Sequence, residues 1–363
     1  MPTMGKPFHI ELPGAVQVPM RLVDGRPTVQ ARVNGKGPFT FGIETGGAFT
    51  VVVNPRLAQA LRTREPNAAP STPGADTLQL GGMTITDLDV AASSGVRGGV
   101  RGLDGLLGLP LFKDVALTVD FIGMKVRIDR DTLPTPNGAD VLPLLRTGPI
   151  TGVEGRIGGR PVTLTIDTQG GGTGLICSPQ LGERMTFQAP LAVLGQARIG
   201  GFDAAPVTTY AARLVGDAQV GGITLKEPII STIPLPPELG CLLGLDFLHS
   251  VSVTLDQRSM RARFSGPAVI PRQPSLFVTG LVAEPDSSGV FHITAMRAGS
   301  AAEASGLQAG DEVVDIAGKP ATLETLAPSA IRALSEERRP ISMTIRRRGE
   351  RIAVTVTPKL LVQ

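Results

Sequence analysis

Two acidic residues occur in matching surroundings and are the strongest candidates for chemistry in this sequence. Glu44 and Asp167 each follow a short apolar segment, and each is followed directly by a threonine. Two carboxyls held a few ångströms apart cannot both ionise at low cost, so such a pair shares a proton and can activate a bound water. The simpler alternative for either residue alone is a buried carboxylate that accepts hydrogen bonds from a turn.

The surroundings of the two acids belong to an internal repeat over roughly the first 265 residues. Four pairs of segments recur in the same order along the chain. They are Phe41–Gly47 with Leu164–Gly170, Leu80–Gly82 with Val220–Gly222, Gly105–Leu109 with Cys241–Leu245, and Leu117–Asp120 with Val253–Asp256. The constant order indicates a duplicated lobe. The offset between copies grows after the first pair, which predicts a longer segment behind the acid of the second lobe.

The elements that must hold these acids read as short β-strands. Apolar and polar residues alternate in segments such as 28–33 and 125–128, and Gly, Pro and Asn mark the breaks. This pattern favours barrels or sandwiches over βαβ units. Pro-rich stretches at 132–138 and 266–274 divide the chain into two lobes and a C-terminal region with a different pattern.

Composition argues against several functional classes. The formal net charge of +3 is too small to indicate nucleic-acid binding, and no apolar run is long enough to span a membrane. Three scattered His and two Cys lack metal-ligand spacing, so we expect no metal site and no cofactor. The first residues lack the apolar stretch of a signal peptide, which indicates either a cytoplasmic protein or a chain without its leader.

The repeat resembles the aspartic peptidases, both retropepsin-like and pepsin-like. The resemblance covers roughly residues 16 to 265. It rests on Gly42-Ile43-Glu44-Thr45-Gly46 with Leu106-Leu107-Gly108, and on Thr165-Ile166-Asp167-Thr168 with Leu242-Leu243-Gly244. It implies a mainly β fold in which two homologous β-barrel lobes, 16–132 and 147–265, form a pseudo-dimer. Each lobe would lend one carboxyl to a shared cleft that takes an extended polypeptide substrate.

The same resemblance implies roles for the residues beside the acids. Thr45 and Thr168 would join the two acid loops by hydrogen bonds, and Gly46 would let backbone and substrate approach closely. The sequence departs from the family twice. Glu44 stands where the family has Asp, and its extra methylene loosens a geometry that needs sub-ångström placement. Gln169 stands where the second motif has Gly, and its side chain either crowds the pair or hydrogen-bonds Glu44.

Two further expectations concern the second lobe. Residues 195–202 resemble a glycine-tipped retropepsin flap, with Gly200 and Gly201 at the tip, so this lobe should carry the larger flap.

Cys177 lies ten residues past the acid and Cys241 directly precedes the Leu-Leu-Gly motif, so the two cysteines should lie close together. They form either a disulfide, which would favour an oxidising compartment, or two buried thiols. Bacterial members of the family are commonly exported, which favours a periplasmic or secreted location.

The C-terminal region, 275–360, resembles a PDZ domain of the kind that bacterial proteases often carry. The resemblance rests on residues 299–313, which read Gly-Ser-Ala-Ala-Glu-Ala-Ser-Gly-Leu-Gln-Ala-Gly-Asp-Glu-Val, and on a closing hairpin. It implies an α/β module that binds extended or C-terminal peptides as an added strand. Thr279, Gly280 and Leu281 would form the loop that takes a terminal carboxylate.

Two functions are therefore in competition. In the first, the protein is an aspartic-type endopeptidase that hydrolyses extended polypeptide through a water held by Glu44 and Asp167, with peptide binding by the PDZ domain. In the second, it is a catalytically impaired aspartic-peptidase-like protein that only binds peptides or proteins. The departures at Glu44 and Gln169 are the sequence features on which the choice depends.

Overall fold

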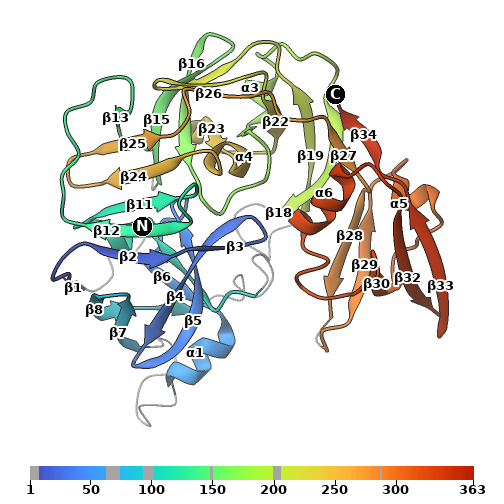
Figure 1. The fold of residues 1–363 in the computed structure, drawn as a ribbon, viewed down its shortest axis with the longest axis horizontal. Helices are drawn as coiled ribbons and strands as arrows, with labels where there is room; N and C mark the ends of the chain where they lie inside the picture. The colour runs from blue at the N-terminus through green and yellow to red at the C-terminus, as the bar shows by residue number, and fades with distance from the viewer. Residues whose placement is uncertain (1–7, 63–73, 93–101, 148–149, 199–205, 287) are drawn as a thin grey trace.

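The protein is built mainly from curled β-sheets, followed by a separate C-terminal module (Figure 1). The computed structural model describes residues 8–62, 74–92, 102–147, 150–198, 206–286 and 288–363. Of these residues, 50% lie in strands and 11% in helices, which confirms the mainly β fold class. Within the same ranges, no helix combines the length and the apolar character needed to cross a membrane.

Lobe one, from β1 to β12, has a curled sheet in which the strand that ends at Glu44 is central. The described strands run in the order β1-β8-β7-β4-β5-β10-β6-β9, with β3 beside β4. They are β1 (His9–Glu11), β3 (Arg21–Val23), β4 (Arg26–Val33), β5 (Lys36–Glu44), β6 (Val51–Val53), β7 (Gly74–Leu80), β8 (Met83–Asp89), β9 (Ala91–Ala92) and β10 (Gly105–Gly108). Helix α1 (Pro55–Arg62) and the short 3-10 helix η1 (Leu109–Phe112) complete this lobe.

Lobe two, from β13 to β26, repeats this arrangement and adds a hairpin. Its strands run in the order β18-β19-β22-β17-β23-β16-β15-β20-β21-β26, with β14 beside β15. They are β14 (Leu145–Thr147), β15 (Ile150–Ile157), β16 (Arg160–Ile166), β17 (Leu175–Cys177), β18 (Ala192–Arg198), β19 (Pro206–Arg213), β20 (Ala218–Val220), β21 (Ile223–Leu225), β22 (Ile229–Thr232), β23 (Cys241–Leu243) and β26 (Val269–Ile270). The helices are α3 (Pro179–Gly182), α4 (Leu245–Leu248) and the 3-10 helix η2 (Pro237–Leu239). The β18–β19 hairpin occupies the longer segment that the repeat offset predicts.

Tight two-residue turns open the hairpins whose second strands lead to the acids. Asn34 and Gly35 both have positive φ and join β4 to β5, with Val33 opposite Lys36. Gly158 and Gly159 do the same between β15 and β16. Such turns match the twist of a hairpin and favour Asn-Gly and Gly-Gly pairs. In lobe two this register continues unbroken to Thr165, whereas in lobe one a bulge between Ala31 and Val33 shifts the pairing before Glu44 is reached.

A sheet of six described strands joins the two lobes. Its order is β13-β25-β24-β11-β12-β2. The strands are β2 (Val16–Pro19), β11 (Ala116–Asp120), β12 (Lys125–Asp129), β13 (Val141–Pro143), β24 (Ser252–Asp256) and β25 (Arg261–Ser265). At its centre Thr118 lies opposite Thr254, its equivalent in the repeat, and their hydroxyl oxygens are 2.9 Å apart. The lobes thus meet through the same segment of each copy.

The cores of the two lobes form one continuous apolar cluster. Phe41 and Ile43 on β5, and Leu164 and Ile166 on β16, are fully buried in it. Burying side chains of this size stabilises the fold by roughly 1.5–3 kcal/mol each. The strands that carry the two acids are therefore firmly anchored in this core.

The C-terminal module contains a curled sheet, a two-stranded sheet and two helices around its own core. The curled sheet has the order β28-β29-β30-β32-β33, with β31 beside β30, and the second sheet pairs β27 with β34. The strands are β27 (Leu276–Val278), β28 (Leu281–Pro285), β29 (Phe291–Met296), β30 (Glu312–Ile316), β31 (Lys319–Pro320), β32 (Ile341–Arg347), β33 (Glu350–Val356) and β34 (Lys359–Val362). The helices are α5 (Ala301–Ala304) and α6 (Pro328–Glu336).

The module packs against lobe two through its two-stranded sheet. A small apolar cluster combines residues of β18, β19 and β22 with residues of β27 and β34. Next to it, the guanidinium of the almost fully buried Arg213 donates to the carbonyls of Glu227 (2.8 Å), Gln273 (2.9 Å) and Pro274 (3.1 Å), and to that of Gln363. One arginine of β19 therefore ties lobe two to the linker and to the last strand.

Candidate active site

The two acids occupy equivalent positions in the two lobes. Glu44 is the last residue of β5, and Asp167 directly follows β16. A strand runs parallel to each: β10 pairs with β5, so that Gly108 lies opposite Glu44, and β23 pairs with β16. The strand in front of each acid is therefore paired on both sides, β5 with β4 and β10, and β16 with β15 and β23. This pairing restricts movement of the backbone at the start of each acid loop.

Close backbone packing explains the glycine that ends each Leu-Leu-Gly motif. A Cβ on Gly108 would lie 1.8 Å from the carbonyl oxygen of Phe49, and one on Gly244 would lie 1.7 Å from that of Thr173. No side chain fits at such distances. These glycines therefore bring the segment behind each acid directly against β10 or β23.

Thr45 and Thr168 join the two acid loops through a reciprocal set of buried hydrogen bonds. The backbone N–H of Thr45 donates to Oγ1 of Thr168 (3.2 Å), and the N–H of Thr168 donates to Oγ1 of Thr45 (3.1 Å). The hydroxyl of Thr45 donates to the carbonyl of Ile166 (2.8 Å), and that of Thr168 donates to the carbonyl of Ile43 (2.6 Å). Each threonine thus fixes the residue that precedes the acid of the other lobe.

This junction brings the Glu44 and Asp167 carboxyls together, close enough for a side-chain hydrogen bond between them. Each carboxyl also accepts from the backbone N–H two residues further on: Glu44 from Gly46 (2.7 Å) and Asp167 from Gln169 (2.9 Å). The glutamate therefore makes the same local contact as the aspartate despite its extra methylene.

Burial raises the pKa of both carboxyls, because the charged forms lose their water. The nearby charge of Asp167 raises the pKa of Glu44 further, whereas its hydrogen bond with Glu44 lowers the pKa of Asp167. Two adjacent buried carboxyls with raised pKa values cannot both ionise at low cost, so the pair shares one proton. Such a pair holds one acid and one base at the same place.

Two glycines make room for this pair. A Cβ on Gly46 would lie 2.7 Å from Cγ of Asp167, and one on Gly47 would lie 2.9 Å from Cγ of Glu44. The first glycine lets the opposite acid approach the loop. The second leaves space for the additional methylene of the glutamate.

Gln169 turns toward lobe one and not toward Glu44. Its side-chain amide donates to the carbonyls of Ile43 (3.0 Å) and Pro27 (3.3 Å), and it lies above Gly42, where a Cβ would be 2.9 Å from Nε2. Its Oε1 is buried and has no hydrogen-bond partner within the described ranges. The Gln169 side chain thus adds hydrogen bonds between the lobes and leaves its own carbonyl oxygen without a donor among the described residues.

Arg26 is a member of the site that sequence reasoning missed. Its Nε donates to the carbonyl of Gln169 (3.0 Å), and its positive charge lowers the pKa of both acids. The pairing of Thr28 with Gly42, continued by two residues, places Arg26 opposite Glu44. No usable signal for this was present in the sequence, because a bulge between Ala31 and Val33 shifts the register set by the Asn34-Gly35 turn. Lobe two has Ile150 at the corresponding position, so only one lobe supplies a cation.

The predicted flap segment forms the β18–β19 hairpin, whose strands pair from Ala192 with Ala211 to Arg198 with Pro206. Gly200 and Gly201, predicted at its tip, lie outside the described residues. On this hairpin Val193 is paired with Tyr210, and both side chains are more than a third exposed. An apolar surface is therefore available on the hairpin.

Cys177 and Cys241 lie opposite each other on the antiparallel strands β17 and β23, and the structure joins them in a disulfide. Both strands belong to the layer that holds the Asp167 loop, since β23 also pairs with β16. The bond therefore braces the strands behind the second acid.

The predicted carboxylate-binding loop of the C-terminal module lies between β27 and β28. Gly280 has φ +77° there, and a Cβ would be 2.4 Å from Cβ of Ser300, so a glycine is required. The carbonyls of Thr279 and Gly280 accept from the N–H groups of Ala302 (2.9 Å) and Arg297 (2.7 Å). Leu281 begins β28, which is the edge strand of its sheet. Beside the loop, Nε of Arg297 is buried without a hydrogen-bond partner in the described part of the chain.

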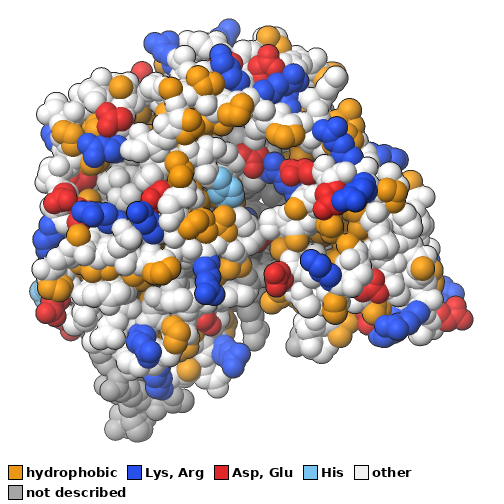
Figure 2. All heavy atoms as spheres, in the orientation of Figure 1, with side chains coloured by type: hydrophobic (Ala, Val, Ile, Leu, Met, Phe, Trp, Pro, Cys, Tyr) orange, Lys and Arg blue, Asp and Glu red, His pale blue; other side chains and the backbone are white. Residues whose placement is uncertain are grey.

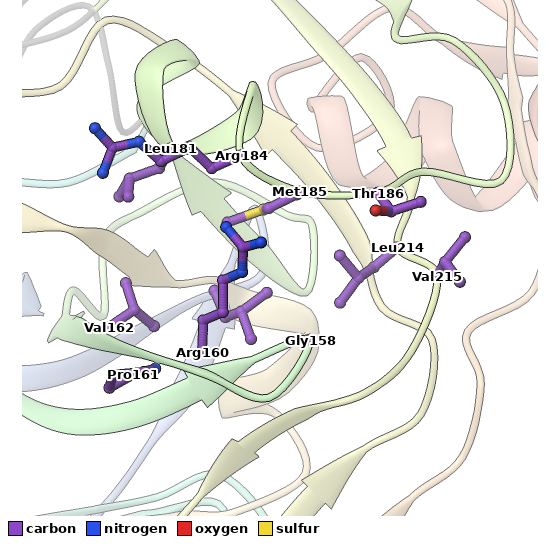
Figure 3. Close-up of a pocket in the computed structure, with 11 residues that line it drawn as sticks. Gly158, Arg160, Pro161, Val162, Leu181, Arg184, Met185, Thr186, Leu214 and Val215 are labelled. Atoms are coloured by element: carbon purple, nitrogen blue, oxygen red, sulfur yellow. The ribbon is translucent and has the colours of Figure 1, made fainter.

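A pocket on the outer surface of lobe two has a volume of about 250 Å³ but does not contain the acids (Figure 3). It lies between the β15–β16 turn, α3 and Leu214. Figure 3 shows Arg160 reaching toward Met185, and no acid or nucleophilic pair lines the pocket. Among the described residues, no group of three or more His, Cys, Asp or Glu side chains is arranged to hold a metal.

Comparison with known proteins identifies the C-terminal module. A family model for the PDZ domain matches residues 292–347. A solved structure of the HtrA3 PDZ domain bound to a phage-derived ligand (FGRWV) is also similar, with 16% identity and a TM-score of 0.21 over 23% of this chain and 86% of that one. No curated protein matches the chain. The chain therefore carries a PDZ domain at residues 292–347, which indicates peptide binding.

Proposed function

We propose that the protein is a two-lobed aspartic-type endopeptidase. In this proposal residues 16–132 and 147–265 form an aspartic-peptidase-like pseudo-dimer, and a PDZ domain spans residues 275–360. The observation that carries it is the reciprocal Thr45–Thr168 bonding, which brings the buried Glu44 and Asp167 carboxyls together at the junction of the two lobes. A structural carboxylate needs no such partner from the other lobe.

In this proposal Asp167 is the base of the pair and Glu44 is the acid. The Asp167 carboxylate takes a proton from a water as the water oxygen forms a bond to the peptide carbonyl carbon. Glu44 gives its proton to the carbonyl oxygen, so the tetrahedral intermediate is neutral. Asp167 then returns its proton to the leaving nitrogen as the C–N bond breaks. One hydroxyl proton of the intermediate restores Glu44, which leaves a carboxylic acid and an amine.

Cleavage of a denatured, fluorescein-labelled casein between pH 4 and 7 tests this function. We expect wild type to release peptides and Asp167→Asn to lower the rate by at least about a hundredfold, because the base is lost. The matched control is Asp286→Asn, which changes an exposed PDZ carboxylate of the same type. If wild type cleaves nothing while its fold is intact, the binding-only function is correct. Cleavage that survives Asp167→Asn would instead contradict the assignment of the pair.

The PDZ domain in this proposal binds C-terminal peptides by strand addition to β28. The open edge of β28, the glycine-dependent loop at Gly280 and the adjacent cation of Arg297 support a terminal carboxylate as the anchor. Calorimetry with a C-terminal peptide library should find ligands that bind more weakly when amidated. In Arg297→Met this preference should shrink, whereas Arg351→Met on the distant hairpin should preserve it.

We also propose a periplasmic or secreted location. The Cys177–Cys241 disulfide supports it, because such bonds persist in oxidising compartments and are rare in reducing ones. Thiol titration of the denatured, non-reduced protein taken from its native compartment should find no free thiol. Two titratable thiols would contradict the location.

A further inference from the structure

One helix of the PDZ domain contacts both lobes next to the acid loop of lobe two. Helix α6 lies between the main body and the rest of the module (Figure 1), and Figure 2 shows acidic and basic side chains gathered along this boundary. The contacts come from the N-terminal and middle residues of α6, Ser329 and Arg332. The boundary is therefore specific and polar, unlike a flexible tether between independent domains.

Arg332 provides the direct contact. Its two terminal nitrogens bind the Asp246 carboxylate at 3.0 and 2.9 Å, and one of them also donates to the carbonyl of Gly172. Asp246 lies on α4, directly behind the second Leu-Leu-Gly motif, and Gly172 lies five residues past Asp167. Bidentate arginine–carboxylate pairs fix geometry as well as adding energy. The Arg332 side chain thus binds both the loop that follows Asp167 and helix α4.

A second route runs through the turn between β3 and β4. The N–H of Ser329, near the N-terminus of α6, donates to the Asp24 carboxylate (2.8 Å), which also pairs with Arg26. A carboxylate is stabilised at a helix N-terminus. Arg26 then reaches the carbonyl of Gln169, two residues past the acid. From lobe two, His249 donates to the carbonyl of Gly25 (2.6 Å) and holds the same turn.

We propose that helix α6 positions the acid loop of lobe two, through Arg332 directly and through Asp24 and Arg26, so that the PDZ domain is a working part of the hydrolytic site. The inference rests on the proposed function for its effect on catalysis. Arg332 and Asp24 are positioning residues, since neither touches the acids. The positive charge of Arg26, which lowers the pKa of both acids, is held in place by the same network.

The test compares Arg332→Met with Arg339→Met. Both arginines lie on or just behind α6, but Arg339 is largely exposed and pairs with the exposed Glu337. With a fluorogenic peptide taken from a wild-type cleavage site, we expect Arg332→Met to lower kcat about tenfold with KM within twofold, because a loop shifted by a fraction of an ångström loses part of its alignment. Arg339→Met should match wild type. Asp24→Ala should lower kcat similarly, and it serves as the second variant if Arg332→Met does not fold.

A second readout separates this inference from the proposed function. Amide hydrogen exchange of residues 168–174 should speed up at least threefold in Arg332→Met and stay unchanged in Arg339→Met. If wild type cleaves and kcat in Arg332→Met is unchanged, the inference is overturned and the proposed function stands. If wild type cleaves nothing, the proposed function fails, and the exchange rates decide the inference: faster exchange supports loop positioning by α6, and unchanged exchange overturns it.

Discussion

The acid of lobe one is one methylene longer than its counterpart, and the loop around it accommodates the difference. Glu44 accepts from the backbone N–H two residues on, as Asp167 does, and Gly47 leaves space for the extra carbon. The sequence suggests that the glutamate loosens the site. In the structure, Gly47 lies next to the extra methylene of Glu44 and leaves room for it. This link between the glutamate and the second glycine of the loop could not be inferred from the sequence.

A first prediction concerns the threonine junction. In Thr168→Val the N–H of Thr45 and the carbonyl of Ile43 lose their buried partner, which should lower the free energy of unfolding by about 3 kcal/mol. Urea denaturation measures this change. Thr168→Ser keeps the hydroxyl and is the control, expected within about 1 kcal/mol of wild type. Equal stability of the valine and serine variants would show that the hydroxyl does not hold the lobes.

A second prediction follows from the raised pKa of Glu44. Below about pH 4.5, its ordinary value, the folded and unfolded forms are both protonated. As the pH rises further, the unfolded chain releases the proton while the folded protein keeps it, so stability declines until the raised folded pKa is passed. Glu44→Gln has no proton to release and can still donate to Asp167.

The stability of Glu44→Gln relative to wild type should therefore increase from pH 4.5 to pH 7.5. Denaturant titrations at four pH values across this window measure the difference. Asp286→Asn should show no such trend, because the hydrogen bond from the Ser288 hydroxyl helps to lower the pKa of the Asp286 carboxyl to about 2, so it is ionised across the window. A relative stability of Glu44→Gln that is constant with pH would mean that Glu44 titrates normally.

At the scale of elements, local signals served well. The alternating segments 28–33 and 125–128 lie in β4 and β12, and the expected closing hairpin of the C-terminal region is formed by β32 and β33. Contacts between distant segments could not be predicted. The pairing of β27 with β34 and the bond from Arg332 to Asp246 depend on how the PDZ domain docks, which no short pattern encodes.

A third prediction concerns the disulfide between β17 and β23. Removing it in the double variant Cys177→Ala/Cys241→Ala frees a loop spanning 64 positions, which the chain-entropy model values at about 4 kcal/mol. We expect the melting temperature to fall. Wild type in a reducing agent should fall to the same value, which separates the bond from the side-chain change. A variant as stable as the oxidised wild type would show that the sheet pairing alone holds these strands.

At the scale of the whole molecule, Arg213 connects lobe two with the linker and the last strand. A fourth prediction is that Arg213→Met lowers the free energy of unfolding by about 3 kcal/mol, because several buried carbonyls lose a charged donor. Chemical denaturation monitored by circular dichroism measures this loss. Arg272→Met, which removes a half-exposed side chain paired with Glu227, is the control and should change stability little. An unchanged Arg213→Met would show that apolar packing alone docks the last strand.

The two lobes meet through contacts between equivalent residues, and this bears on how far their sequences can differ. Thr118 meets Thr254 and Thr45 meets Thr168, so each contact joins a residue to its own equivalent. Such a self-complementary interface is the kind that two identical chains form around a twofold axis. Within one continuous chain, the halves no longer need to share a sequence. That freedom permits glutamate on one side and aspartate on the other, a cation from only one β-hairpin, and a PDZ domain that braces a single acid loop.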